Sequence, residues 1–165
     1  MQNLTAISSC VRLARNYADF PFDLTDRPED AEALITRTVN AMSTSELFDH
    51  CSLFILSDMQ ENQRQVLCEA GLISKDLLRH ERTGAVLLDT ERQVSIMMNE
   101  DDHVRIQALC DGDDLQTAAD RVFTVDDALS RQVRFAFDRE LGYLTAFPAN
   151  TGTGMRASML VHLPM

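Results

Sequence analysis

Two runs of alternating residues, at 94–98 and 104–110, constrain the fold of this chain more than any other feature of the sequence. Alternation with a period of two is typical of strands, and the short acidic segment between the runs favours a hairpin. The apolar run at 51–56 predicts a further strand, which we expect to be buried. Other strands are predicted at 6–15, 84–88, 143–147 and 156–163.

Apolar residues at helical spacing separate these strands. They predict one helix that begins at Pro28, a second over 59–70, and a third that is capped by Asp113 or Asp114 and runs to Phe137. Because strands and helices are mixed without a regular βαβ rhythm, we expect an α+β fold. In such a fold a largely antiparallel sheet is flanked by helices.

The charge balance excludes several classes of partner. The chain carries 26 acidic residues against 15 basic ones, a formal net charge of −11. Such a surface repels nucleic acid and acidic lipid. No apolar run reaches the length of a membrane span, and the first residues lack the layout of a signal peptide. We therefore expect a cytoplasmic protein that binds neither nucleic acid nor membrane.

Cysteine spacing, histidine spacing and length add three further expectations. The cysteines lack CxxC spacing, which indicates reduced, mostly buried thiols and no zinc site, and we predict no metal bound by side chains alone. His50, His80 and His162 have no partner spacing and are predicted to be structural or surface residues. No repeat or linker divides the 165 residues, so a single domain, 1–165, is expected.

The first segment with chemical potential is 8–15. If it is a strand, Cys10 and Arg12 share one face, while Val11 and Leu13 share the other. A cationic strand face can hold phosphate oxygens. The alternative is a half-exposed strand whose arginines are solvated.

The second is the corner between the two alternating runs. Glu100, Asp101 and Asp102 follow one strand, and His103 and Arg105 open the next. Carboxylates beside an arginine can position a cationic substrate, take a proton from it, or help to hold Mg²⁺. The alternative is an acidic hairpin turn without chemistry.

The third is the glycine-containing segment 150–158. Its small residues allow backbone N–H groups to approach an anion, and Arg156 adds a guanidinium. It is not a Walker loop, because no GK[ST] follows. The alternative is a flexible loop before a strand.

Together these segments match a known set of sequence patterns. In this chain SSCVRLARN and the following FPF are similar to the pattern SSRVRLARN…FP. LCEAGLIS at 67–74 is similar to the pattern EKHLIS. VSIMMNEDDHVRIQ at 94–107 is similar to VSIMxNEEDHxRIQ, and the stretch from DDALS to HLP is similar to DDxLE…GYLTxCPTNxGTGxRASVMxHLP. The chain thus resembles the ATP:guanido phosphotransferases, the phosphagen-kinase family, and is most similar to its bacterial protein-arginine kinases.

The resemblance implies an incomplete phosphagen-kinase catalytic domain of the glutamine-synthetase-like type. It implies phosphoryl transfer from ATP, with Mg²⁺, to a guanidino group, in bacteria that of protein arginine. Asp101 would orient the guanidinium and accept its proton, with Glu100 beside it. The nucleotide would be held by Ser8, Ser9, Arg12, Arg105, Arg156, Ala157 and Ser158.

Four positions depart from the family patterns. Cys10 replaces an arginine, Asp101 replaces a glutamate, Gly71 replaces a histidine that touches nucleotide, and Phe147 replaces a cysteine beside the guanidino group. Family members also continue beyond the last match, which makes this chain the expected N-terminal part of a catalytic domain. By itself it is expected to bind ATP weakly and to be inactive.

Two functions therefore stay open. The first is a degenerate or truncated kinase acting on protein arginine. The second is a catalytically inactive relic or regulatory binding module of the protein-arginine kinase system. The expected partners are a protein arginine substrate or a partner protein of that system, and a homodimer is a further expectation.

Overall fold

Six strands form the central sheet of the computed structural model, which describes residues 5–163. The strands follow the order β2-β3-β4-β5-β1-β8, and all neighbours are antiparallel. Their bounds are Thr5–Arg15 for β1, Cys51–Ile55 for β2, Ala85–Asp89 for β3, Val94–Met98 for β4, Val104–Asp111 for β5 and Met155–His162 for β8. The predicted α+β fold with a largely antiparallel sheet is confirmed.

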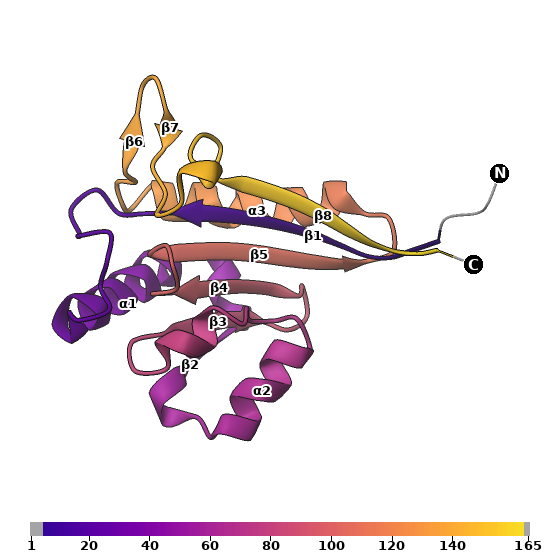
Figure 1. The fold of residues 1–165 in the computed structure, drawn as a ribbon, viewed down its shortest axis with the longest axis horizontal. Coiled ribbons are helices and arrows are strands. Elements are labelled where there is room, and N and C mark those ends of the chain that lie inside the picture. The colour runs from indigo at the N-terminus through magenta and orange to yellow at the C-terminus, as the bar shows by residue number, and fades with distance from the viewer. Residues whose placement is uncertain (1–4, 164–165) are drawn as a thin grey trace.

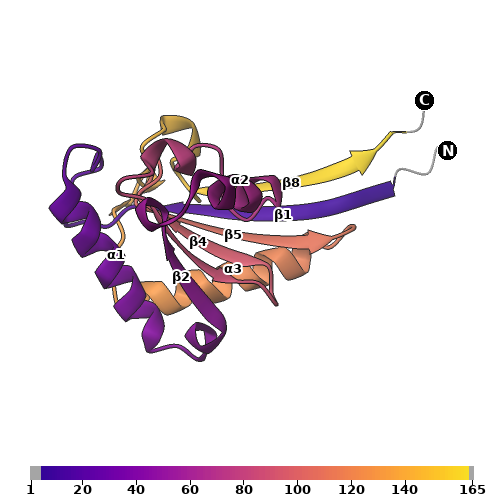
Figure 2. The ribbon, with the colours of Figure 1, turned by 90° about the horizontal axis from the view of Figure 1, so that it is seen from below.

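Helices cover both faces of this sheet (Figures 1 and 2). They are α1 (Pro28–Ser43), α2 (Glu61–Glu69) and α3 (Leu115–Ser130). α1 and α3 pack on one face, whereas α2 and the 3₁₀ turn Leu77–His80 pack on the other. Within residues 5–163 no helix is both long and apolar enough to cross a membrane.

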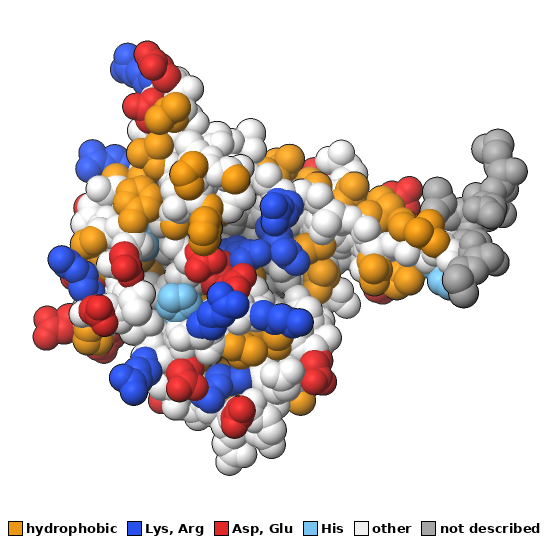
Figure 3. Space-filling model, viewed as in Figure 1, with side chains coloured by type: hydrophobic (Ala, Val, Ile, Leu, Met, Phe, Trp, Pro, Cys, Tyr) orange, Lys and Arg blue, Asp and Glu red, His pale blue; other side chains and the backbone are white. Residues whose placement is uncertain are grey.

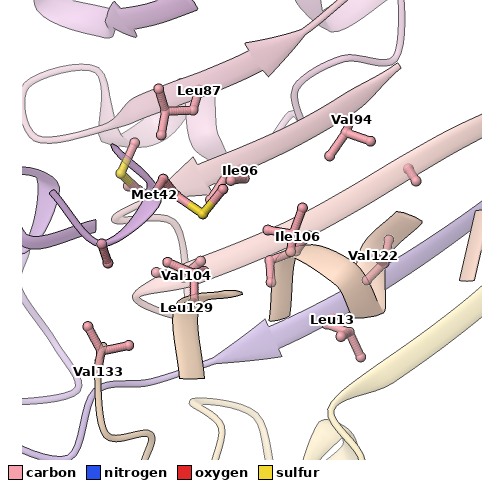
Figure 4. Close-up of a cluster of buried hydrophobic side chains, with 14 of the residues drawn as sticks. Leu13, Met42, Leu87, Val94, Ile96, Val104, Ile106, Val122, Leu129 and Val133 are labelled. Atoms are coloured by element: carbon pink, nitrogen blue, oxygen red, sulfur yellow. The ribbon is translucent and has the colours of Figure 1, made fainter. Parts of the chain in front are cut away.

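The larger hydrophobic cluster lies between the sheet and the helices α1 and α3 (Figure 4). Leu87 and Ile96 enter it from the sheet, Met42 from α1 and Val122 from α3. A smaller cluster on the opposite face consists of Leu56, Ile73, Leu77, Val86, Leu88 and Met97. Full burial of such a side chain stabilises the fold by about 1.5–3 kcal/mol. β3 and β4, which are buried throughout, therefore form a rigid platform.

Asn99 sets the turn between β4 and β5. Its φ of 58° is in the left-handed region, which asparagine tolerates better than most residues. Its side-chain amide donates hydrogen bonds to the carbonyls of Ala31 (3.0 Å) and Thr83 (2.8 Å). The acidic corner is consequently not a solvated turn, since Glu100 and Asp102 are buried.

The strand predicted at 51–56 is present, but the prediction that it is buried is wrong. Among residues 5–163, β2 pairs only with β3 and forms one edge of the sheet. Leu53 is 42% exposed, whereas Leu56 is fully buried just after the strand ends. An apolar run of this length shows that a strand exists but not where it lies in the sheet.

The third helix is shorter than predicted, because α3 ends at Ser130 and not near Phe137. The following residues pair with the segment after β1, and the N–H of Ala136 donates to the carbonyl of Asn16 (2.7 Å). Phe137 lies in the small hairpin of β6 (Phe137–Asp138) and β7 (Gly142–Tyr143). Tertiary pairing thus overrides the helical spacing.

The strand predicted at 143–147 is reduced to β7. After it, the N–H of Ala146 donates to a carboxylate oxygen of Asp102 (2.7 Å), and a 3₁₀ turn follows at Pro148–Asn150. The buried carboxylate of Asp102 thus accepts a hydrogen bond that the carbonyl of a neighbouring strand would otherwise accept.

Candidate active site

Three arginines from the three sequence segments lie on one face of the sheet. Arg12 on β1 stands directly opposite Arg156 on β8, and Arg105 lies on β5, the other neighbour of β1. All three line a cavity of about 410 Å³, here called the arginine cavity, together with Glu100 and Asp101. Figure 3 shows basic and acidic side chains gathered in the middle of this face. Like charges opposite each other destabilise a sheet, so this arrangement favours an anion between them.

Arg12 provides a specific test of whether a phosphate group fits. Its Nε is buried and has no hydrogen-bond partner in the described part of the chain. A buried donor without a partner costs about 1–3 kcal/mol. An anionic oxygen in the arginine cavity would remove that cost, so the residues present fit a phosphate.

Arg105 is held by Glu100. One of its terminal nitrogens lies 2.6 Å from each carboxylate oxygen of Glu100, whose side chain is only 2% exposed. The hydroxyl of Ser74 donates to the same carboxylate and accepts the N–H of Leu77 (3.0 Å). Glu100 therefore orients Arg105 and neutralises part of its charge, which leaves Asp101 as the half-buried carboxylate of this corner.

A second cavity, of about 590 Å³, adjoins the first and is here called the acidic cavity. It shares Glu100, Asp101 and Phe147 with the arginine cavity. Phe22 and Asp23 are among the residues that line the acidic cavity but not the arginine cavity. Carboxylates and aromatic rings together suit a cationic group.

His80 also lines the acidic cavity, although its sequence context predicts only a structural or surface residue. Its positive charge, when present, lowers the pKa of Asp23, after the larger effects of the hydrogen bonds from Thr25. No sequence signal pointed to His80, because it lies outside every matched segment.

Asp102 and His103 hold the corner in place. Asp102 accepts a hydrogen bond from the side-chain amide of Asn16 (2.6 Å), and Asn16 in turn accepts the backbone N–H of His103 (2.8 Å). The Nδ1 of His103 accepts the N–H of Tyr17 (2.9 Å), and its Nε2 donates to the carbonyl of Pro21 (2.6 Å). Burial lowers the pKa of His103 below 6.5, so the neutral ring is favoured.

Arg15, the last residue of the segment 8–15, is buried, so the alternative of solvated arginines does not hold for it. Its guanidinium forms two hydrogen bonds of 2.9 Å with Asp126 of α3 and lies 3.6 Å from the centre of the Tyr143 ring. It also donates to the carbonyl of Thr153 (2.9 Å). Arg15 therefore fixes the loop that leads into Arg156.

Gly154 packs against β1 and also lines the arginine cavity. Its φ is 63°, and a Cβ at this position would lie 2.6 Å from the carbonyl oxygen of Ala14. The N–H of Ala14 donates to the carbonyl of Gly154 (2.8 Å). The glycine thus sets the start of β8, and through it the position of Arg156.

Four predicted nucleotide residues lie outside the arginine cavity. Ser9 is buried on the opposite face, where its hydroxyl donates to the carbonyl of Gly112 (2.7 Å) and accepts the N–H of Asp114 (3.0 Å). Ala157 shares that face, opposite Val11. The other two, which are absent from the cavity wall, are Ser8 and Ser158.

The arginine cavity also contains residues that the sequence reasoning missed. Arg79 and Asp76 line it and lie 3.3 Å apart as an ion pair. They follow the LCEAGLIS segment closely, but no pattern distinguishes them from surface charges. Within residues 5–163, no group of three or more His, Cys, Asp or Glu side chains could hold a metal ion.

Comparison with known protein families matches residues 33–165 to the ATP:guanido phosphotransferase, C-terminal catalytic domain. The chain belongs to the ATP:guanido phosphotransferase family. Its fold agrees with that of other members. The substrate-free duplicated taurocyamine kinase from Schistosoma mansoni superposes with a TM-score of 0.82 at 25% identity, over 94% of this chain and 23% of that one.

Curated relatives carry the name protein-arginine kinase. The protein from Clostridium kluyveri is 42% identical over 96% of this chain and 46% of its own length. The protein from Pelotomaculum thermopropionicum is 44% identical over 96% of this chain and 45% of its own length. This guanido phosphotransferase chain therefore spans about half the length of the curated relatives it matches.

Proposed function

We propose that this domain takes part in phosphoryl transfer from ATP to the guanidino group of protein arginine. The observation that carries the proposal is the pair of adjoining cavities that share Glu100, Asp101 and Phe147: four arginines line one of them, and no arginine or lysine among the described residues lines the other. A donor that is rich in negative charge suits the arginine cavity, and a cationic acceptor suits the acidic cavity. The reacting groups would meet at the shared wall.

In this proposal, Arg12, Arg105 and Arg156 bind the phosphate groups of ATP. Forked guanidinium donors match phosphate oxygens, and they stabilise the charge that spreads over those oxygens during transfer. Mg²⁺ would arrive with the phosphates and supply further charge neutralisation. The buried, unpartnered Nε of Arg12 supports an anion at this place.

Asp101 would act on the acceptor. A guanidinium is a poor nucleophile while it is protonated, so a carboxylate must orient it and take a proton. Asp101 lines both cavities and is therefore within the shared wall where this step is needed. Glu100 would act indirectly, by holding Arg105.

The relatives support the choice of acceptor. Because they are named protein-arginine kinases, an arginine side chain within a protein is the favoured substrate. We place the protein in the bacterial cytoplasm and propose that residues 1–165 form one partial catalytic domain.

One observation favours the alternative of a catalytically inactive binding module. Phe147 is 53% exposed and lines both cavities, at the wall where the two reactants would meet. A large ring there reduces the space for a guanidino group. In this alternative the arginine cavity would still bind a phosphorylated ligand, and the domain would regulate a partner instead of catalysing transfer.

Calorimetry with Mg-ATP tests the phosphate-binding part of the proposal. We expect weak binding, with a Kd above ~10 µM, and at least a ~10-fold loss of affinity in Arg12→Ala or Arg156→Ala, because one charge-assisted hydrogen bond contributes about 1.5–3 kcal/mol. Arg139→Ala, in the exposed β6–β7 hairpin, is the matched control. Equal losses in all three variants, or no binding at millimolar ATP, would contradict the proposal.

A further inference from the structure

A fourth arginine lines the arginine cavity from a different part of the chain. Arg79 belongs to the 3₁₀ turn Leu77–His80, whereas Arg12, Arg105 and Arg156 lie on strands of the sheet. Arg79 also lies outside every segment that matches the family patterns. The fold of this chain, and not a pattern, therefore brings its guanidinium to the cavity.

The backbone of this turn is held by its neighbours. Leu77 is fully buried, and its N–H donates to the hydroxyl of Ser74 (3.0 Å), which itself donates to the carboxylate of Glu100. The N–H of Arg79 donates to the carbonyl of Asp76 (3.0 Å). Because Glu100 belongs to the same cavity wall, these hydrogen bonds fix the Cα of Arg79 relative to the cavity.

The side chain of Arg79 is held much less firmly than its backbone. It is 77% exposed, and Asp76, its only ion-pair partner within residues 5–163, lies 3.3 Å away and is itself 40% exposed. Exposed ion pairs contribute little, because water and salt screen them. Arg105, by contrast, lies 2.6 Å from the buried Glu100. The guanidinium of Arg79 can therefore leave Asp76 at little cost, whereas Arg105 stays with Glu100.

The balance of charge around the cavity leaves a role for Arg79. Four arginines and four carboxylates line the cavity, and the carboxylates are Asp76, Glu100, Asp101 and Asp102. Glu100 neutralises part of the charge of Arg105, and neither Arg12 nor Arg156 forms an ion pair in the described part of the chain. A phosphate chain carries several negative charges, which two guanidinium groups do not balance. Arg79 is the further cation that such a ligand can recruit.

We infer that Arg79 is a fourth phosphate-binding residue, which exchanges the carboxylate of Asp76 for a phosphate oxygen when ligand enters the arginine cavity. A guanidinium donates two parallel hydrogen bonds to a phosphate group, and these bonds compete well with an exposed ion pair. Asp76 thus competes with the ligand for Arg79. The inference rests on the proposed function in one respect, namely that the ligand is the phosphate chain of a nucleotide.

Titration calorimetry with inorganic tripolyphosphate and with Mg-ATP tests the contact. We expect Arg79→Ala to weaken the binding of both ligands at least ~5-fold, since it removes a charge-assisted hydrogen-bond donor. Arg82→Ala is the matched control. It removes the same charge three residues later, at an exposed position that lines neither cavity, and should change the affinity less than ~2-fold.

Substitution of Asp76 tests the exchange of partners. Asp76→Asn should strengthen tripolyphosphate binding ~2–5-fold, because Arg79 is then no longer shared with a carboxylate. The same substitution in an Arg79→Ala background should have much less effect, since no guanidinium is left to release. An equal gain in both backgrounds would show that Asp76 acts only as a nearby negative charge, and would overturn the exchange.

Nitrogen-15 NMR of the arginine Nε–H groups observes Arg79 without relying on affinity. Its signal, identified by its absence from Arg79→Ala, should shift when tripolyphosphate is added and should not shift with sodium chloride at the same ionic strength. A signal that does not respond to tripolyphosphate at saturation would overturn the inference.

The calorimetry separates failure of this inference from failure of the proposed function. Unchanged affinity in Arg79→Ala, together with losses in Arg12→Ala and Arg156→Ala, would overturn the inference and leave the proposed function in place. So would equal losses in Arg79→Ala and Arg82→Ala, or a loss confined to tripolyphosphate. Binding of neither ligand at millimolar concentration would contradict the proposed function and the inference together.

Discussion

At the scale of single residues, Arg15 and Arg105 show two uses of one side chain within the same sheet. Arg15 is 3% exposed and belongs to the scaffold, where Asp126 balances its charge. Arg105 is 18% exposed, shares its charge with Glu100 and lines the arginine cavity. Both were predicted from the sequence as arginines of strands, and only their partners distinguish a structural role from a binding role.

Substitution of Asp126 tests the structural role of Arg15. Asp126→Asn is expected to lower the free energy of unfolding by about 3–5 kcal/mol, because it leaves the buried guanidinium of Arg15 without a counter-charge. Asp127→Asn, at the exposed neighbouring position of α3, is the control and should change it by less than ~0.5 kcal/mol. Urea denaturation measures both. A loss of the same size in the two variants would show that the ion pair with Arg15 is not the cause.

His103 predicts a dependence of stability on pH. Burial keeps its pKa in the folded state below 6.5, the value that an unperturbed histidine has when the chain is unfolded. As the pH falls below about 6.5, the unfolded state takes up a proton before the folded state does, so stability decreases. Protonation of Nδ1 would also break its hydrogen bond from Tyr17. His103→Gln should therefore lose less stability than the wild type between about pH 7.5 and 5.5.

Urea titrations at the two pH values measure this difference. His162→Gln, at an exposed position of β8, is the control and should retain the pH dependence of the wild type. Equal pH dependence in wild type and His103→Gln would assign the effect to other groups.

At the level of secondary-structure elements, the N-terminal cap of α3 helps to position Asp126, the residue of α3 that pairs with Arg15. The sequence left Asp113 and Asp114 as alternative caps, and the structure selects Asp114, which accepts the backbone N–H of Thr117 (3.1 Å). The side chain of Thr117 lowers the pKa of Asp114, and the hydrogen bond from its backbone N–H lowers it further. Twelve positions later α3 presents Asp126 to Arg15, so the start of the helix also determines where this anchor lies.

Substitution of the capping residue Asp114 should therefore destabilise the domain, whereas substitution of the neighbouring Asp113 should not. Asp114→Ala is expected to lower the urea midpoint, while Asp113→Ala should leave it nearly unchanged, because only Asp114 accepts the N–H of Thr117. The carboxylate form is favoured in the folded state, so the contribution is present at neutral pH and is lost as the pH falls through the lowered pKa. Identical midpoints for the two variants at neutral pH would contradict this role.

At the scale of the whole molecule, the purified chain 1–165 is expected not to phosphorylate protein arginine by itself. Asp101 is one methylene shorter than the glutamate of the family pattern, and a misplacement of ~1 Å can cost ~10²-fold in rate. Phe147 reduces the space at the wall that the two cavities share. Cys10 stands where the family pattern has an arginine, so one guanidinium is missing. Because these changes act on one transition state, repair of any single position should restore little.

Mass spectrometry of phosphoarginine in a substrate protein measures this activity. The wild-type chain is compared with a variant that combines Cys10→Arg, Asp101→Glu and Phe147→Cys, each with and without the unmatched half of a relative. We expect turnover only where that half is present. Turnover by the unmodified chain alone that disappears in Arg156→Ala would make this chain a minimal kinase and overturn the prediction.

The sequence alone predicted the class of fold and three arginines that line one cavity. Period-two alternation at 94–98 and 104–110 predicted β4 and β5, and helical spacing from Pro28 predicted α1, because these periods follow from backbone geometry alone. Matched segments predicted Arg12, Arg105 and Arg156 together, and the three line one cavity.

Which polar groups are partners became known only from the folded chain, because pairing between distant segments leaves no periodic signal. Arg15 and Asp126, or Ser74 and Glu100, are joined by the fold and not by spacing. The folded chain also determines where a helix ends and which strands lie at the edges of the sheet. Pairing with the segment after β1 ended α3 at Ser130, and the order of the strands left β2 and β8 exposed at the two edges of the sheet. Whether an apolar strand is buried depends on what lies beside it, which is a property of the assembled sheet and not of its residues.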